Sequence, residues 1–221
     1  MNISEAIAAR HSVRRYHKKP LDAEVISAIQ SEIADCNLES DLHIQLVTNE
    51  PKAFDCFMAH YGKFSGVTNY IAMIGKNDSE LDEKCGYYGE RLALKAQQLG
   101  LNTCWVAMSY SKINTAFEIH KGEKLCLVIA LGYGETQGVS HKSKQISEVA
   151  KTDGEMTDWF KNGVEAALLA PTAMNQQKFL FTLSGNKVSV KSGVGFYTKV
   201  DLGIVKYHFE AGAGKENFEW V

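Results

Sequence analysis

The sequence lacks the runs and clusters that would place it in several common classes of protein. No apolar run among its 221 residues approaches the roughly 18 residues needed to cross a bilayer. The N-terminus carries an acid, Glu5, where a secretory signal peptide has a basic region. A formal net charge of -2 gives no reason to expect nucleic acid or an anionic membrane as a partner. We therefore expect a soluble cytoplasmic protein in which any anion site is local.

Metal-binding and nucleotide-binding signatures are also missing. The five cysteines are widely spaced without a C-x-x-C pair, which favours reduced thiols, and the seven histidines form no H-x-x-x-H pattern. We therefore expect no metal. A P-loop ending at Gly214-Lys215 fails because its first glycine would be Phe209 and no Ser or Thr follows the lysine. Gly193-Val194-Gly195 lacks the third glycine of a dinucleotide-binding loop.

The pattern of apolar residues predicts a mixture of helices and strands without regular alternation, which is typical of an α+β fold. The polar stretch 135–153 is the predicted linker, which divides the chain into domains 1–150 and 151–221. The predicted helices are 2–9, 22–34, 51–61, 79–100, a short one from Ser111, one from 153 or 157 to 170, and 201–213. The predicted strands are 42–48, 69–75, 101–108, 125–131, 179–184, 187–191 and 218–221.

The first candidate site is the segment Arg10–Tyr16, called the arginine segment below. If it is extended, Arg10, Ser12 and Arg14 lie on one side. Two guanidinium groups flanking a hydroxyl suit a phosphate ester, because arginine donates bidentate, charge-assisted hydrogen bonds. Tyr16 either covers this side or anchors the segment to the core. A solvated basic turn is the alternative interpretation.

A weak internal repeat suggests two related halves. Residues 25–48 align without a gap with residues 161–184, and both predict a helix, a turn and a strand. Acids, Asp35 and Glu39, stand in the first copy where the second copy has neutral residues, and they would repel a phosphorylated ligand. The repeat predicts a pseudo-dimer within one chain, with one site per chain.

Four motifs together resemble those of the FMN-dependent nitroreductase family. The arginine segment matches R-x-S-x-R-x-F/Y, and Ala170–Phe179 matches A-P-S/T-x-x-N-x-Q-P-W/F except for Lys178 in place of proline. Leu99–Trp105 matches L-G-L-x-T-C-W, and Leu131–Tyr133 matches a fourth motif. The A-P-S/T loop lies in the C-terminal half, so the chain resembles the two-part subgroup of this family.

The resemblance implies a nitroreductase-like fold with mainly antiparallel central sheets flanked by helices. It implies a flavin oxidoreductase that passes electrons from NADH or NADPH through FMN to a nitroaromatic, a quinone or a similar small acceptor, by a ping-pong mechanism. Residues 151–221 would take the part that a partner subunit plays in ordinary members, giving a monomer or loose homo-oligomer with one FMN site per chain. A flavin-binding or sensing protein without turnover is the alternative, and a cofactor-free relic is a third.

The resemblance also implies the residues that bind the cofactor. Arg10 and Ser12 would hold the phosphate or ribityl chain, and Arg14 the pyrimidine edge. Asn175 would bind the ring edge, and the backbone at Val106–Met108 would approach N5. No catalytic side chain is identifiable, because flavin N5 carries the chemistry. The complete set is Arg10, His11, Ser12, Arg14, Trp105, Val106, Ala107, Met108, Lys142, Lys144, Pro171, Thr172, Ala173 and Asn175.

Alternatives stay open for several of these residues. Asn175 is equally typical of a turn-capping asparagine, and Trp105 and Met108 of core packing. Lys142 and Lys144 suit either a phosphate contact or a solvated linker.

Overall fold

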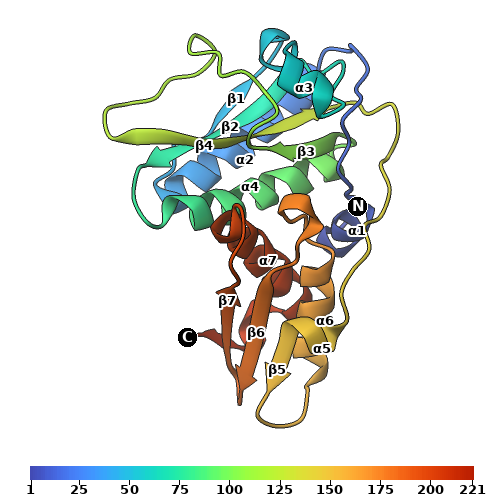
Figure 1. The fold of residues 1–221 in the computed structure, drawn as a ribbon, viewed down its shortest axis with the longest axis vertical. Coiled ribbons are helices and arrows are strands. Elements are labelled where there is room, and N and C mark those ends of the chain that lie inside the picture. Colours follow the sequence, from blue (N-terminus) through green and yellow to red (C-terminus); the bar gives the residue numbers. More distant parts are fainter. The chain divides into compact units, whose positions relative to one another are not determined.

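The computed structural model describes residues 1–221 and has mixed helix and sheet (Figure 1). The α-helices are α1 (Ile3–Ala9), α2 (Ala23–Ser40), α3 (Phe57–Tyr61), α4 (Leu81–Gln98), α5 (Ile146–Val149), α6 (Asp158–Leu168) and α7 (Thr198–Ala213). The strands are β1 (Gln45–Val47), β2 (Asn69–Lys76), β3 (Asn102–Val106), β4 (Glu123–Gly132), β5 (Ala150–Thr152), β6 (Phe179–Ser184), β7 (Lys187–Ser192) and β8 (Glu219–Trp220). Three short 3-10 helices are η1 (Lys52–Phe54), η2 (Ala173–Asn175) and η3 (Lys215–Asn217).

The chain forms two compact units. The N-terminal unit comprises Ala9–Leu81 and Arg91–Val139, and the C-terminal unit comprises Met1–Ala8, Asp82–Glu90 and Ser140–Val221. The sequence prediction divides the chain at residue 150 instead.

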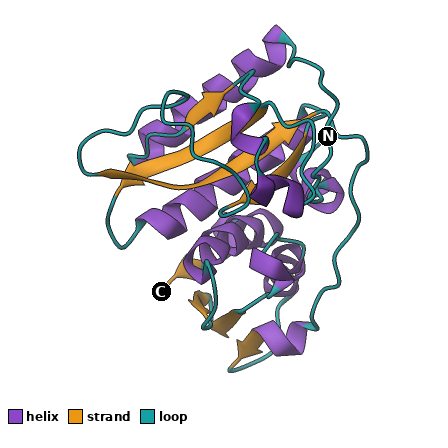
Figure 2. Ribbon diagram, turned by 45° about the horizontal axis from the view of Figure 1, so that its top comes forward, coloured by secondary structure: helices purple, strands orange, loops and turns teal.

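The N-terminal unit is built on a four-stranded sheet in the order β1-β2-β4-β3, with every neighbouring pair antiparallel. Figure 2 shows these strands in orange with helices beside them. Strand β2 is buried along nearly its whole length, because its alternating side chains meet protein on both faces. On one face, Tyr70 of β2, Val128 of β4 and Cys104 of β3 belong to the same hydrophobic cluster as Phe54 and Phe64.

The C-terminal unit has a second four-stranded sheet in the order β5-β6-β7-β8. The hairpin β6–β7 is antiparallel, whereas β5 and β8 each run parallel to their neighbour. The core is aromatic: Phe181 stacks on Phe209 of α7 with ring centroids 4.6 Å apart, and Phe209 also contacts Phe160 of α6 at 5.7 Å. Gly163 of α6 lies where a Cβ atom would meet the Phe209 ring at 2.7 Å, which explains a glycine within this helix.

The predicted fold class is confirmed: antiparallel sheet with flanking helices. Three local predictions were wrong. The helix predicted to end at residue 34 continues to Ser40 and ends at Asp41, which takes a left-handed φ of 60°. No helix follows Ser111, whose N–H instead donates to the carbonyl of Ala53. The stretch predicted as a linker contains α5 and β5.

The structure also changes the proposed repeat. Asp35 and Glu39 lie inside α2 rather than in a loop, so they do not correspond to the turn after α6. The pseudo-dimer therefore stays a prediction. None of the helices is both long enough and apolar enough to cross a membrane.

Candidate functional site

The arginine segment is extended and is held by backbone hydrogen bonds. The N–H of Val13 donates to the carbonyl of Thr103 beside β3 at 3.0 Å, and the N–H of Tyr16 donates to the carbonyl of Ser65 at 3.0 Å. Burial does not alternate strictly along the segment: Ser12 and Arg14 are exposed, but Arg10 and Tyr16, which strict alternation would place on the same side, are buried. The segment thus presents polar side chains from a fixed backbone.

Tyr16 anchors this segment to the core. Its side chain is 3 % exposed, and its hydroxyl donates to the carbonyl of Val13 at 2.6 Å. Burial raises the pKa of the Tyr16 phenol well above its ordinary value, so the phenol stays neutral and remains a donor. Of the two roles expected for Tyr16, the structure shows the anchor.

Arg10, Ser12 and Arg14 lie in the neighbourhood of Cys104 of β3, because Ser12 is paired with Thr103, the residue before Cys104. Burial raises the pKa of this thiol, and three nearby groups oppose the rise: the positive charges of Arg14 and Arg10, and a hydrogen bond involving Ser12. Both guanidinium groups therefore lie near enough to Cys104 to affect its thiol. That these three side chains form one anion site stays a prediction.

The two arginines differ in exposure. Arg10 is 2 % exposed, at the end of α1, whereas Arg14 reaches solvent with its guanidinium carbon 5.9 Å from the centre of the Phe64 ring. His11 is half-buried, and its Cβ lies 2.7 Å from where a Cβ on Gly138 would stand. Gly138 also has a φ of +76°, so two independent reasons require glycine there.

The stretch Trp105–Met108 leaves β3 beside this cluster. Val106 is buried with Cys104 in the core, whereas Met108 is 67 % exposed and is not core packing. Trp105 and Ala107 are half-buried. Backbone that emerges directly from a buried strand is held rigidly, which suits close approach to a planar ligand.

The second candidate element, the loop Ala170–Gln177 in the C-terminal unit, has an unusual backbone. Met174, Asn175 and Gln177 have φ values of 52°, 53° and 45°. Non-glycine residues in this region cost of order 1–3 kcal/mol each and persist only where the surroundings hold them.

Gln177 is the centre of the network that holds this loop. It is 2 % exposed, and its amide nitrogen donates to the Lys142 carbonyl at 2.9 Å and to Asn175 Oδ1 at 2.8 Å. Its amide oxygen accepts from the N–H of Lys144 at 2.9 Å, and Lys144 Nζ donates to the Gln177 carbonyl at 2.8 Å. Asn175 Nδ2 donates to the Lys142 carbonyl as well. The stretch around Lys142 and Lys144 is therefore part of the loop's support.

Asp201 of α7 fastens the other side of the loop. Its carboxylate accepts from the N–H of Ala173 at 2.9 Å and from Gln176 Nε2 at 2.7 Å. Burial raises the pKa of Asp201 to about 6, and these two hydrogen bonds only partly offset the rise. Thr172 contributes its hydroxyl, which accepts from the N–H of Gln177 at 3.0 Å.

The structure therefore gathers the predicted residues into two groups. In the N-terminal unit, Arg10, Ser12 and Arg14 lie in the neighbourhood of Cys104. In the C-terminal unit, Lys142, Lys144, Thr172, Ala173 and Asn175 join one hydrogen-bonded loop, and Pro171 is half-buried within it. Three supporting residues, Cys104, Gln177 and Asp201, were not predicted as part of the site. Cys104 and Gln177 stand within the motifs quoted above, and these motifs were the sequence signal for them. No quoted motif includes Asp201.

Comparison with known proteins assigns the family. The α+β fold, with an antiparallel sheet and flanking helices, is that of the nitroreductases. The sequence matches the family described as "Putative TM nitroreductase" over residues 2–213, so the chain belongs to this family. No curated protein matches the sequence.

Several solved structures share the fold. One, described as a putative nitroreductase from Thermotoga maritima, has a TM-score of 0.66 and 23 % identity over 95 % of this chain and 82 % of that one. A putative NADH dehydrogenase/NAD(P)H nitroreductase from Parabacteroides distasonis has a TM-score of 0.54 and 21 % identity, over 70 % and 100 % of the two chains. A putative nitroreductase in complex with FMN, from Desulfovibrio desulfuricans, has a TM-score of 0.53 and 18 % identity, over 67 % and 94 %.

The residues around Cys104 fit the phosphate end of FMN. Two guanidinium groups and a hydroxyl are hydrogen-bond donors of the kind that bind phosphate oxygens, and their backbone is fixed on β3.

Proposed function

We propose that this chain binds one FMN and transfers electrons from NADH or NADPH to a small electron-poor acceptor such as a nitroaromatic or a quinone. Family membership supports an FMN-dependent oxidoreductase, as does the solved structure of the same fold that is described as a complex with FMN. A ping-pong order, in which donor and acceptor use the same place in turn, follows from the resemblance.

One observation carries the proposal: the arginine segment is paired with β3 through Ser12 and Val13 at Thr103. Arg10, Ser12 and Arg14 therefore lie in the neighbourhood of Cys104. In a chain with a net charge of -2, this local concentration of positive charge is a specific place for an anion. The burial of Arg10 strengthens its electrostatic effect, because a partly desolvated charge is screened less by water and salt.

Each residue has a distinct proposed role. Arg10 and Ser12 bind the phosphate or ribityl chain, and Arg14 orients the ring by its pyrimidine edge, where a cation stabilises negative charge. The backbone at Val106–Met108 would approach the ring near N5 and exclude water there. When bound, FMN supplies the hydride chemistry.

The loop Ala170–Gln177 is the second proposed contributor. The resemblance to the family motif supports this role, and so does the held backbone with three positive φ values, because such strain clusters at ligand sites. Asn175 is exposed, and its amide has one further hydrogen and one further lone pair beyond its contacts within the loop. Asn175 can therefore hold the loop and bind a ligand at once.

The decisive experiment compares two neighbouring arginines. Purified protein is loaded with FMN, freed of excess and measured by its visible absorbance. We expect about one FMN per chain, and a roughly 10- to 100-fold weaker FMN affinity in Arg14→Ala, since a charge-assisted hydrogen bond contributes about 1.5–3 kcal/mol. The control is Arg15→Ala, because Arg15 is also exposed but pairs with Glu135 at 3.6 Å. Equal FMN affinity in the two variants would remove Arg14 from the site.

Addition of NADH or NADPH then separates the enzyme from its alternative. Loss of the flavin bands, followed by their return with a quinone, supports the oxidoreductase. Retained flavin that neither donor bleaches supports a flavin-binding protein without turnover. Failure to retain any flavin contradicts both.

Solution mass tests the pseudo-dimer prediction. One FMN per chain in a monomer supports it. FMN that binds only to a dimer, or two FMN per chain, would contradict it.

A further inference from the structure

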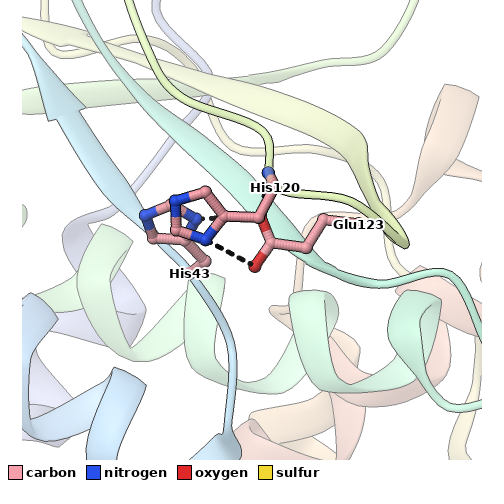
Figure 3. Close-up of side chains that lie close together, drawn as sticks. All are labelled: His43, His120 and Glu123. Atoms are coloured by element: carbon pink, nitrogen blue, oxygen red, sulfur yellow. Dashed lines mark hydrogen bonds and ion pairs between the residues drawn. The ribbon is translucent and has the colours of Figure 1, made fainter.

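A second cluster of polar side chains lies in the N-terminal unit, outside the proposed flavin site. His43 stands just before β1, Glu123 is the first residue of β4, and His120 lies in the turn before β4. Figure 3 shows the two imidazole rings stacked, with the carboxylate of Glu123 beside them. The ring centroids are 4.5 Å apart and the planes differ by 24°.

The nitrogen and oxygen atoms of this cluster are spaced as metal ligands are. His43 Nδ1 lies 3.0 Å from Glu123 Oε2, and His120 Nδ1 lies 3.7 Å from Glu123 Oε1. The candidate ligand atoms of all three residues lie within 4.8 Å of one another. With Zn–N and Zn–O bonds of about 2.0–2.2 Å, a tetrahedral site holds its ligand atoms about 3.3 Å apart. The two measured distances bracket that value.

The carboxylate is already oriented. Glu123 Oε2 accepts a hydrogen bond from the N–H of His120 at 2.7 Å, so the backbone of the turn holds the oxygen that contacts the His43 ring, and Oε1 is the oxygen nearer to the His120 ring. The side chains of Glu123 and His43 are 15 % and 27 % exposed, whereas that of His120 is 64 % exposed. Two ligands are thus held by the fold, and the third reaches solvent, where water can complete the coordination.

The neighbour Gln45 defines where the proton of His43 resides. The Gln45 amide is fixed in orientation, because its nitrogen donates to the Glu118 carbonyl at 2.7 Å and its oxygen accepts from the Glu118 N–H at 2.9 Å. The same nitrogen lies 3.2 Å from His43 Nε2, which must therefore accept. The proton stands on Nδ1 and points at Glu123. A metal ion bound at Nδ1 takes the place of that proton, which moves to Nε2, so metal binding costs the hydrogen bond from Gln45 to His43.

We propose that His43, His120 and Glu123 form a binding site for a divalent transition metal of the Zn²⁺ type. Two imidazoles and one carboxylate form a donor set that Zn²⁺ uses in proteins with open positions left to water. Imidazole nitrogen favours Zn²⁺, Ni²⁺ or Cu²⁺ over Mg²⁺ and Ca²⁺, which prefer oxygen. The bound ion links the segment before β1 to the turn before β4, so it stabilises the end of the sheet at which these two strands begin.

The site has no signature in the sequence, because His43 and Glu123 are 80 residues apart. The proposal replaces the expectation that no metal binds, which rested on the absence of a local histidine pattern. It is independent of the proposed flavin chemistry.

The test uses chelator-treated full-length protein titrated with Zn²⁺ alone in competition with a chromophoric chelator. We expect one Zn²⁺ per chain in this site. Loss of a direct ligand in His43→Ala, His120→Ala or Glu123→Gln should weaken affinity by more than the roughly 10- to 100-fold that loss of an outer-shell partner costs. His60→Ala is the matched control, because His60 is also exposed and lies 3.5 Å from a single carboxylate, that of Asp55. Its affinity should equal that of the unaltered protein.

Two further measurements separate this site from zinc bound elsewhere on the chain. Thermal unfolding with Zn²⁺ should raise Tm in the unaltered protein and in His60→Ala but not in His120→Ala, whose exposed side chain can be removed without unfolding the chain. Co²⁺ should give visible bands without the near-ultraviolet band of a cobalt–thiolate bond, which excludes Cys56 and Cys126 as ligands. Absent binding, unchanged affinity in His120→Ala, an equal rise in Tm in all three proteins or a cobalt–thiolate band would each overturn the proposal.

Discussion

The arginine segment and the loop Ala170–Gln177 are both proposed to bind the cofactor, but different forces hold them. The arginine segment is anchored by burial: Val13 and Tyr16 are each 3 % exposed, and the backbone bonds to the carbonyls of Thr103 and Ser65. The loop exposes Met174 at 91 % and is held by side-chain hydrogen bonds instead.

The two elements should therefore respond differently to mutation and to pH. Burial stabilises a whole unit cooperatively, so damage to the arginine segment should unfold it. A polar network acts locally and depends on protonation, so damage to the loop should loosen only the loop. The loop is therefore the part that pH or a ligand can adjust.

The largest expected effect is in Tyr16→Ala. Removal of this buried aromatic ring should lower the free energy of unfolding of the N-terminal unit by about 3–5 kcal/mol, measured by urea denaturation. Tyr16→Phe should cost only about 1 kcal/mol, because it keeps the ring and loses only the hydroxyl, which donates to the Val13 carbonyl at 2.6 Å and lies 3.5 Å from the Ala130 carbonyl. Met174→Ala in the loop is the contrasting control and should stay within about 0.5 kcal/mol. A loss under about 1 kcal/mol in Tyr16→Ala would contradict anchoring by burial.

The next effect concerns Asp201 and pH. Its folded-state pKa of about 6 lies above the ordinary 3.8, so its contribution to stability is full below about pH 3.8 and is lost as pH rises through about 6. The change is at most about 3 kcal/mol. Asp201→Asn cannot ionise, so the stability of the unaltered protein relative to this variant should fall between about pH 4 and pH 7. A pH-independent difference, measured by urea denaturation across this range, would show that Asp201 does not titrate as described.

A smaller and more local effect is expected for Gln177→Ala. Three hydrogen bonds of the Gln177 amide are lost, and the buried groups left without partners cost about 1–3 kcal/mol. Hydrogen exchange should speed up in residues 142–144 and 170–177, with little change at β6. Gln176→Ala is the comparison, because it breaks the bonds to Asp201 and Phe196 and leaves the Lys142 side intact. Uniformly faster exchange throughout the C-terminal unit would contradict a local network.

Periodicity was sufficient to predict most elements of both units, because β2, β4 and the hairpin β6–β7 carry their burial pattern in the sequence. Periodicity failed where the local structure depends on contacts that the pattern of apolar residues does not record. The helix predicted after Ser111 does not form, and the chain makes a single turn there instead, in which the N–H of Ala116 donates to the Ile113 carbonyl. Helix α2 continues past residue 34 because Asn37 caps its end through Ile44, with an Asn37 Nδ2 to Ile44 carbonyl distance of 3.0 Å.

For the candidate site, too, some features were predictable from the sequence and others were not. Alternation in an extended segment predicted that Arg10, Ser12 and Arg14 share one side, but Ser12 and Arg14 are exposed whereas Arg10 is buried. Motif spacing identified the loop. The roles of Cys104, Gln177 and Asp201 could not be predicted, because each depends on which buried groups meet in the folded chain. The positive φ of a non-glycine residue such as Met174 also cannot be predicted from local residue preferences.

The smallest expected difference is between Lys142 and Lys144, for which the sequence left the same two interpretations open. The structure uses the side chain of Lys144, whose Nζ donates to the Gln177 carbonyl, but only the backbone carbonyl of Lys142. Lys144→Ala should therefore cost about 1 kcal/mol in loop stability, and Lys142→Ala should stay within about 0.5 kcal/mol, by hydrogen exchange at residues 170–177. If FMN affinity falls in Lys142→Ala while exchange is unchanged, Lys142 contacts the ligand directly. If both variants behave alike, the Lys144 contact does not stabilise the loop, and the support comes from Gln177 and Asp201 alone.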